Sequence, residues 1–196
     1  IMRLEPSGYV RMQKGPALLL VDTAPVGADY QPGHAHADTL SFELSWGGRR
    51  VFTNSGTSTY VTDRQRLWER STAAHNTLTV DRKNSSEVWG SFRVGRRARP
   101  FDVRCSESNE QLTLEASHDG YNWLSGRPVP RRRIVVGDAE LRIRDEVVGS
   151  GAHEVVGYLH LHPDMQTARV AEHAIRLCAP GVKMMLSSKD GALTVE

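Results

Sequence analysis

The stretch TLSFELSWGGRRVFT, residues 39–53, decides the fold class. Polar and apolar residues alternate from Thr39 to Trp46, which is typical of a strand with one buried face. Gly47 and Gly48 follow as a two-residue turn, and a second strand-like run covers residues 49–53. Two such runs around a Gly-Gly pair predict a β-hairpin. On its first strand, the face expected to be buried carries Leu40, Phe42, Leu44 and Trp46.

Similar short runs continue on both sides of this hairpin. They cover residues 8–13, 17–22, 76–80, 88–94, 111–116, 131–136, 140–148, 154–160, 174–178 and 182–186. Turns every 8–12 residues or so suggest an all-β sandwich or barrel. So many strands in one chain favour a large antiparallel two-sheet β-sandwich. One short helix is expected over Asp63–Ala74, with Thr62 or Asp63 as its cap.

The composition is that of a soluble globular protein, with 39% hydrophobic and 24% charged residues among 196. The longest aliphatic run, residues 17–21, is far shorter than the roughly 20 residues of a membrane-spanning helix, so we expect no membrane span. We expect one domain over residues 1–196. Because the first residue is Ile1, we expect it to be a piece of a longer protein, with any targeting signal outside it.

Arginine dominates the positive charge. Only four of the 25 basic residues are lysines, although the formal net charge is only +2. The guanidinium fork fits carboxylate, sulfate or phosphate groups in a bidentate way. Between Ser91 and Ile134 nine arginines face five acidic residues, an excess too small to predict a nucleic-acid partner. An acidic polysaccharide and solvated strand edges are both compatible with it.

The densest group of chemically active residues is Gly33-His34-Ala35-His36-Ala37-Asp38. On an extended backbone, histidines at i and i+2 point to one side, as a metal pair or a base with a ligand requires. Two more polar clusters also lie at predicted strand ends, Asn54-Ser55-Gly56 and Ala74-His75-Asn76. Functional loops of a sandwich gather at such ends.

These clusters, in this order and spacing, resemble the heparinase II/III-like family of bacterial polysaccharide lyases. The resemblance is carried by Gly8-Tyr9, the run from Pro32 to Phe42, Asn54-Ser55-Gly56-Thr57 with Tyr60, and Arg70 to Thr77. It is strong over about residues 8–80. It is weaker beyond, through Trp89-Gly90 and residues 158–163.

The resemblance implies the C-terminal β-sandwich of an enzyme whose N-terminal α/α toroid is absent from this chain. Such enzymes cleave uronic-acid polysaccharides by β-elimination, usually in the periplasm. It places His34 in the catalytic cleft and His36 and His75 on a zinc ion. The isolated chain is expected to be inactive, because the family's tyrosine acid/base lies in the toroid. The expected partners are an acidic polysaccharide and the chain's own toroid.

One position departs from the family pattern. The third zinc ligand is an aspartate in the family, and Asn54 stands at that position here. A neutral amide oxygen is a poorer zinc ligand than a carboxylate. The metal site is therefore absent, weak, or completed by another group such as Asp38 or water.

Elimination requires a base for the C5 proton and a group that neutralises the neighbouring carboxylate. An imidazole suits either role, so we expect His34 to contact the reacting uronate. Arg66 or Arg70 would bind a substrate carboxylate and Tyr60 a sugar, with packing or a surface ion pair as the alternative for all three. Among the four tryptophans, Trp89 is the best candidate for a glycan platform, whereas Trp46 continues a core face.

We expect the other histidines and the cysteines to have structural rather than catalytic positions. His160 and His162 repeat the i, i+2 spacing, with Leu159 and Leu161 expected to face the core. The isolated histidines are expected at the surface, and the two cysteines as free, partly buried thiols. These residues are His118, His153, His173, Cys105 and Cys178.

Two other functions share features with this sequence. A cupin also carries an HxH pair on a β-barrel, but Glu43 follows His36 too late, and His75 and Asn76 are adjacent. The spacing therefore fails. A non-catalytic carbohydrate-binding or structural sandwich remains open, since it explains the arginines and Asn54 without any chemistry.

Overall fold

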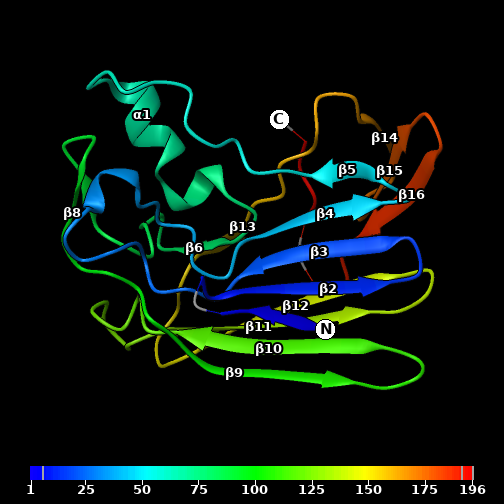
Figure 1. Ribbon diagram of the computed structural model, residues 1–196, viewed down its shortest axis with the longest axis horizontal. Helices are drawn as coiled ribbons and strands as arrows, with labels where there is room; N and C mark the ends of the chain where they lie inside the picture. The colour runs from blue at the N-terminus through cyan, green and yellow to red at the C-terminus, as the bar shows by residue number, and fades with distance from the viewer. Residues whose placement is uncertain (6, 191, 196) are drawn as a thin grey trace.

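Two antiparallel sheets form the two layers of the molecule (Figure 1), in a computed structural model that describes residues 1–5, 7–190 and 192–195. The first sheet has the order β1-β2-β3-β4-β5 and the second has the order β12-β11-β10-β9. The strands of the first sheet are β1 (Met2–Leu4), β2 (Tyr9–Lys14), β3 (Ala17–Asp22), β4 (Phe42–Trp46) and β5 (Arg49–Phe52). Those of the second sheet are β9 (Pro100–Glu107), β10 (Leu112–His118), β11 (Val129–Val136) and β12 (Leu141–Val148).

Three smaller antiparallel sheets complete the strands that the structure describes. They are β6 (Leu78–Val80) with β13 (Val155–Gly157), β7 (Val88–Trp89) with β8 (Arg93–Val94), and β14 (Gln166–Ala171), β15 (Ala174–Ala179) and β16 (Val182–Ser187) in sequence order. The single α-helix of these residues is α1 (Arg64–Glu69), and 3-10 turns cover Pro32–His34 and Thr72–Ala74.

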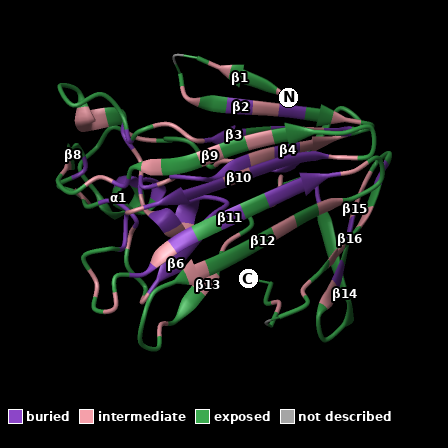
Figure 2. Cartoon of the chain, turned by 90° about the horizontal axis from the view of Figure 1, so that it is seen from below, coloured by how far each residue is buried: buried purple, intermediate pink, exposed green. Residues whose placement is uncertain are grey.

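The main core lies between the two large sheets and extends beneath β15. Leu19 and Met12 of the first sheet, and Leu114 and Ile134 of the second, are 0% exposed, and they belong to one cluster of apolar side chains. Figure 2 shows this burial as purple stretches along β10 and β11. Burying each such side chain contributes about 1.5–3 kcal/mol. The predicted all-β sandwich is confirmed.

The predicted hairpin of residues 39–53 is also confirmed. Trp46 pairs with Arg49, and Gly47 and Gly48 have φ values of 58° and 80°. Left-handed backbone at both turn positions matches the right-handed twist of the flanking strands. The strand begins at Phe42 rather than at Thr39, because Leu40 has φ 62° and leaves the extended conformation. Leu40 is nevertheless buried in the core, as predicted.

Other predicted elements have different bounds. Residues 88–94 form two two-residue strands around a turn rather than one strand. The helix is shorter than predicted, because the Thr72 N–H donates to Asn84 Oδ1 and so leaves the helical pattern. Its cap is Asp63, whose carboxylate accepts from the Arg66 N–H at 2.9 Å.

Three strands were not predicted: β1, β9 and β14. β9 begins with a proline and bends at Asp102, which has φ 53°. β14 is exposed at every position, so it shows no apolar alternation. None of the helices that the structure describes is long and apolar enough to cross a membrane.

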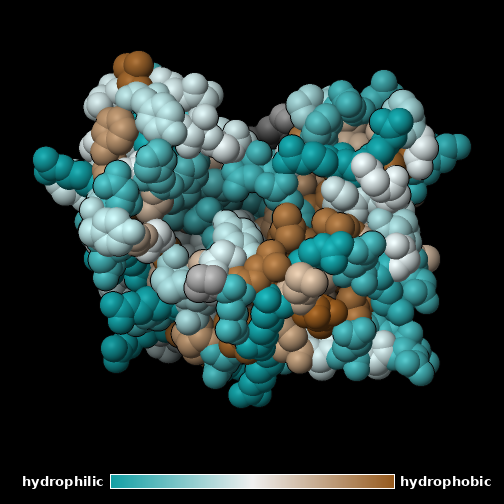
Figure 3. All heavy atoms as spheres, in the orientation of Figure 1, coloured by the Kyte–Doolittle hydropathy of each residue, from teal (hydrophilic) through white to brown (hydrophobic). Residues whose placement is uncertain are grey.

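The loops that carry the polar clusters around His36 and His75 meet at one end of the sandwich. In Figure 1 this end carries α1, β6 and β8, at the left of the view. The space-filling view in the same orientation shows mainly pale and teal side chains over that end, and brown apolar ones over the middle of the first sheet (Figure 3).

Candidate functional site

Three potential metal ligands from two distant segments come together at this end. One ligand atom from each of His36, Asp38 and His75 lies within 4.8 Å of the other two. The first two follow the 3-10 turn at Pro32–His34, and His75 follows the turn at Thr72–Ala74. Two imidazoles and a carboxylate are a donor set that suits zinc. The residues present therefore fit the zinc ion that the family resemblance implies, with Asp38 as the completing group considered from the sequence.

The His36 ring contacts groups at both of its nitrogens. Its Nδ1 lies 3.2 Å from His75 Nε2, and its Nε2 lies 3.1 Å from Thr57 Oγ1. Burial and repulsion from His75 lower the pKa of His36 to about 4. Burial lowers the pKa of His75 to about 4 as well. Both rings are therefore neutral near pH 7, which is the form that binds a metal ion. Thr57 belongs to a motif that carries the resemblance, but its contact with His36 was not predicted.

Two carboxyl groups, those of Asp38 and Asp22, accompany the histidines. Burial raises the pKa of Asp38, and burial together with the Asp38 charge raises the pKa of Asp22 to about 8. Asp22 Oδ1 accepts a hydrogen bond from the Ala24 N–H at 2.8 Å. A cation beside Asp38 would favour its charged form, because opposite charges stabilise each other strongly at buried positions.

Asn54, the residue at the family's aspartate position, has a backbone hydrogen-bond partner of its own. Asn54 Oδ1 accepts a hydrogen bond from the Gly56 N–H at 2.8 Å, which closes the turn after β5. One lone pair of the amide oxygen is therefore used by the backbone. Asp38, the substitute considered from the sequence, supplies the carboxylate next to the two histidines.

His34 has different neighbours from His36. Its exposed ring lies edge-on to the ring of Tyr60, with centroids 5.7 Å apart. The backbone at His34 belongs to a 3-10 turn and not to the extended segment that the spacing suggested. His34 therefore faces solvent beside Tyr60, while the half-buried His36 contacts His75. Tyr60 itself is 61% exposed and free to meet a ligand.

Arg66 and Arg70, predicted as carboxylate ligands, are both 0% exposed. Arg70 donates from Nε to Ala35 O at 2.9 Å and from Nη2 to Pro32 O at 3.1 Å. Arg66 likewise donates to backbone carbonyls. With their donors inside the protein, neither side chain can reach a substrate in this conformation. This placement corrects the expected ligand role and agrees with the packing alternative.

Trp89, the predicted glycan platform, is 48% exposed on the β7–β8 hairpin. The guanidinium carbon of Arg93 lies 4.8 Å from the centre of its ring. Trp46 packs against the core, as predicted.

Among the other histidines, His118 is only 2% exposed, so its predicted surface position is wrong. It lies on the inner face of β10, and its Nδ1 accepts from the Gly120 N–H. His153 contacts Asp81 at 2.8 Å. His160 is held at 2.8 Å from Ala73 O. Leu161 packs against the core as predicted, but Leu159 is 37% exposed and does not.

Cys105 and Cys178 are free and half-buried, as expected.

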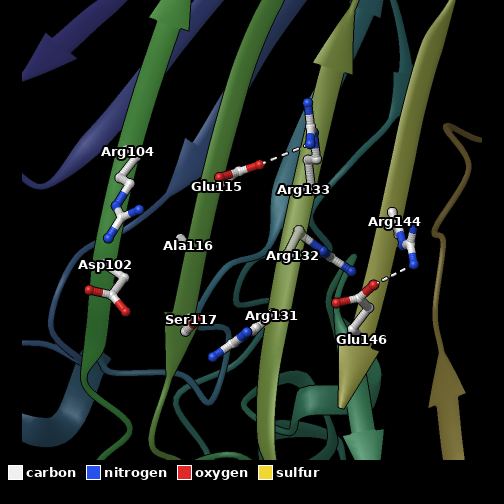
Figure 4. A pocket seen from close by; sticks show the side chains of 10 residues that line it. All are labelled: Asp102, Arg104, Glu115, Ala116, Ser117, Arg131, Arg132, Arg133, Arg144 and Glu146. Atoms are coloured by element: carbon white, nitrogen blue, oxygen red, sulfur yellow. Dashed lines mark ion pairs between the residues drawn. The ribbon is translucent and has the colours of Figure 1, made fainter. Parts of the chain in front are cut away.

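A shallow groove of about 360 Å³ lies on the outer face of the second sheet (Figure 4). Arginines and acidic residues alternate along it, with ion pairs from Arg133 to Glu115 at 3.2 Å and from Arg144 to Glu146 at 2.5 Å. These pairs satisfy much of the charge. None of the histidines discussed above lines this groove.

Comparison with known proteins places this geometry in a family. The profile described as "Heparinase II/III-like, C-terminal" matches residues 2–196. A heparin-sulfate lyase of Bacteroides stercoris is 29% identical over 142 residues, which are 70% of this chain and 19% of the relative. The chain thus spans about a fifth of that relative.

Solved structures show the same fold. A mutant of the heparan sulfate lyase HepC from Pedobacter heparinus matches with a TM-score of 0.67 and 19% identity, over 88% of this chain and 26% of the other. A heparinase III, the BT4657 gene product, matches with a TM-score of 0.66 and 25% identity, over 87% of this chain and 25% of the other. The chain belongs to the heparinase II/III-like family and corresponds to its C-terminal domain.

Proposed function

We propose that this chain is the sandwich domain of a lyase that cleaves a uronic-acid polysaccharide of the heparan-sulfate type by β-elimination. The observation that carries the proposal is the position of His34, exposed beside Tyr60 and two residues before the half-buried His36. The names of the similar proteins support the substrate class. Because the chain spans only part of them, we propose that it needs a further domain, an α/α toroid, for turnover.

His34 would act on the reacting uronate, as base for the C5 proton or as donor to the carboxylate. The carbanion that forms next to a carboxylate needs its charge neutralised. An imidazole performs either role, since it exchanges a proton near neutral pH. The oxygen that leaves C4 needs a proton from a second group, which we assign to the toroid.

His36, Asp38 and His75 would hold a zinc ion at the base of the same loop. The ion would supply a fixed positive charge and tie the His34 loop to the segment at His75. Burial keeps the two imidazoles neutral at pH 7, ready to bind it. In this proposal the role of the metal is structural.

The test is ultraviolet detection of unsaturated uronate, using the full protein that carries this domain with heparan sulfate, heparin and alginate. His34→Ala should abolish product. His173→Ala is the matched control, because His173 is exposed at the turn between β14 and β15, and it should leave the rate within twofold. Product that survives His34→Ala would contradict the role of His34.

A non-catalytic carbohydrate-binding module is the second candidate. It is favoured by Asn54, whose amide replaces a charged ligand and serves the backbone of Gly56. This candidate predicts polysaccharide binding by the folded full protein with no product from any of the three substrates.

A further inference from the structure

Arg66 links three loops through its guanidinium group. The side chain is 0% exposed, and all three of its nitrogens donate to backbone carbonyls. Nε donates to Ser91 O at 2.9 Å, Nη1 to Thr59 O at 3.0 Å and Nη2 to Gly33 O at 2.6 Å. Each acceptor lies one residue before an exposed ring. Those rings are His34, Tyr60 and Phe92.

The same guanidinium group also contacts two of these rings. Its carbon lies 4.9 Å from the centre of Tyr60 and 4.5 Å from the centre of Phe92. Both distances are within the range of a cation–π contact. The edge of Phe92 also lies close to Gly33, since a Cβ built on that glycine would be 3.7 Å from Phe92 Cδ1. Both aromatic rings are thus placed relative to the backbone that carries His34.

Two features of this arrangement cost free energy. Ser91 has φ 61° although it is not glycine, and it is 0% exposed; L residues disfavour that conformation. The Arg66 charge is buried without a carboxylate among its described hydrogen-bond partners, which is also costly. Such departures from low-energy geometry are more common at functional sites than elsewhere.

Much of both rings faces outward. Tyr60 is 61% exposed and Phe92 is 37% exposed, and one end of the pair lies against His34. Aromatic faces bind the apolar C–H face of a pyranose ring, as they bind other apolar surfaces. The guanidinium charge beneath the rings attracts an anionic sugar more than a neutral one.

We propose that Tyr60 and Phe92 form a stacking platform for an acidic sugar next to the one that His34 contacts, and that Arg66 is the positioning residue that fixes the platform relative to His34. The proposal rests on the proposed function in one respect, namely that His34 meets a polysaccharide. It adds Phe92 as a substrate contact and changes the role of Arg66 from ligand to support.

The first test compares Phe92→Leu with Phe101→Leu in the full protein. Phe101 is 39% exposed and lies on β9 in the second sheet, so it matches Phe92 in type and exposure. Binding of heparan sulfate, heparin and alginate is measured together with kcat and KM. Phe92→Leu should weaken binding of the preferred polysaccharide and raise its KM by about tenfold, with kcat within twofold. Phe92→Tyr should restore both, and Phe101→Leu should change neither.

The second test addresses the positioning role. Arg66→Lys keeps the charge but cannot reach three carbonyls, so it should raise KM by about as much as Phe92→Leu. In the double variant, Arg66→Lys should raise KM by less than twofold above the value for Phe92→Leu alone, because Phe92→Leu has already removed the platform. A purely structural arginine would lower the melting temperature and leave this coupling at zero, which would overturn the positioning role.

The outcomes separate the platform from the lyase. Wild-type turnover with an unchanged KM in Phe92→Leu would overturn the platform and keep the lyase. Binding without product, weakened by Phe92→Leu alone, would keep the platform and overturn the lyase. A folded wild-type protein that neither binds nor cleaves any of the three polysaccharides would overturn both.

Discussion

His36 Nδ1 lies 3.2 Å from His75 Nε2, although the two residues are 39 positions apart in the chain. Two imidazole nitrogens at that distance either share one proton or both turn lone pairs toward a cation. Because ligand atoms of Asp38, His36 and His75 all lie within 4.8 Å of one another, the second arrangement is the one that the proposed zinc site requires. The contact between His36 and His75 brings the loop that carries His34 next to the segment that precedes β6.

The carboxylate of this cluster should decide metal affinity. Asp38→Asn should weaken zinc binding at least tenfold, since it removes the one charged ligand of the set. Asn54→Ala should weaken it less, because Asn54 Oδ1 already serves Gly56. Zinc titration with a competing chelator measures both, and Asp164→Asn, at an exposed position, is the control. A larger loss from Asn54→Ala would reverse the assignment.

Asp22 should make the unfolding free energy depend on pH. Its pKa is raised to about 8 in the folded protein, so the folded state holds a proton that the unfolded state releases above pH 4. Its contribution to stability is complete below pH 4 and is lost as pH rises toward 8. Asp22→Asn keeps an acceptor for the Ala24 N–H and should be more stable than wild type at pH 8 by about 1–3 kcal/mol.

Urea unfolding of the metal-free protein at pH 5 and pH 8 checks this expectation. The advantage of Asp22→Asn should be smaller at pH 5. An advantage that is equal at both pH values would contradict the raised pKa.

How far the sequence predicted the site depended on whether the signal was local. The hairpin at Gly47–Gly48 and the cap, predicted as Thr62 or Asp63, follow from neighbouring residues; the hairpin is confirmed, and the cap is Asp63. The contacts that bury Arg66 and Arg70 were not predicted, because their acceptors are backbone carbonyls up to 38 positions away. Every residue has a backbone carbonyl, so the sequence does not show which of them accept hydrogen bonds from a distant side chain. Likewise, the contact of Phe92 with Arg66 joins two loops that no periodicity relates.

The buried arginine Arg70 should be important for stability. Arg70→Ala removes the donors to Pro32 O and Ala35 O, and each buried acceptor left unpaired costs about 1–3 kcal/mol. A loss of roughly 3 kcal/mol or more is expected in urea unfolding. Arg64→Ala, at an exposed position of α1, the helix that Arg70 follows as C-cap, should change stability by less than about 0.5 kcal/mol. Equal losses would show that burial is not the reason.

The turn at Gly47 and Gly48 should tolerate asparagine better than a β-branched residue. Gly48 has φ 80° and open space around its Cα, so a side chain there meets only the conformational penalty. Gly48→Val should cost about 1–2 kcal/mol. Gly47→Asn should be nearly neutral, because asparagine adopts the left-handed conformation readily. Melting temperatures of the two variants measure this difference, and equal values would contradict the left-handed turn.

The central claim is that the full protein breaks its polysaccharide by elimination beside His34. The most direct measurement is product analysis after digestion of heparan sulfate in water enriched in heavy oxygen. Elimination predicts a C4–C5 double bond in the new terminal sugar and no solvent oxygen in either fragment. Heavy oxygen at the cleaved bond, without the double bond, would identify hydrolysis and contradict the account.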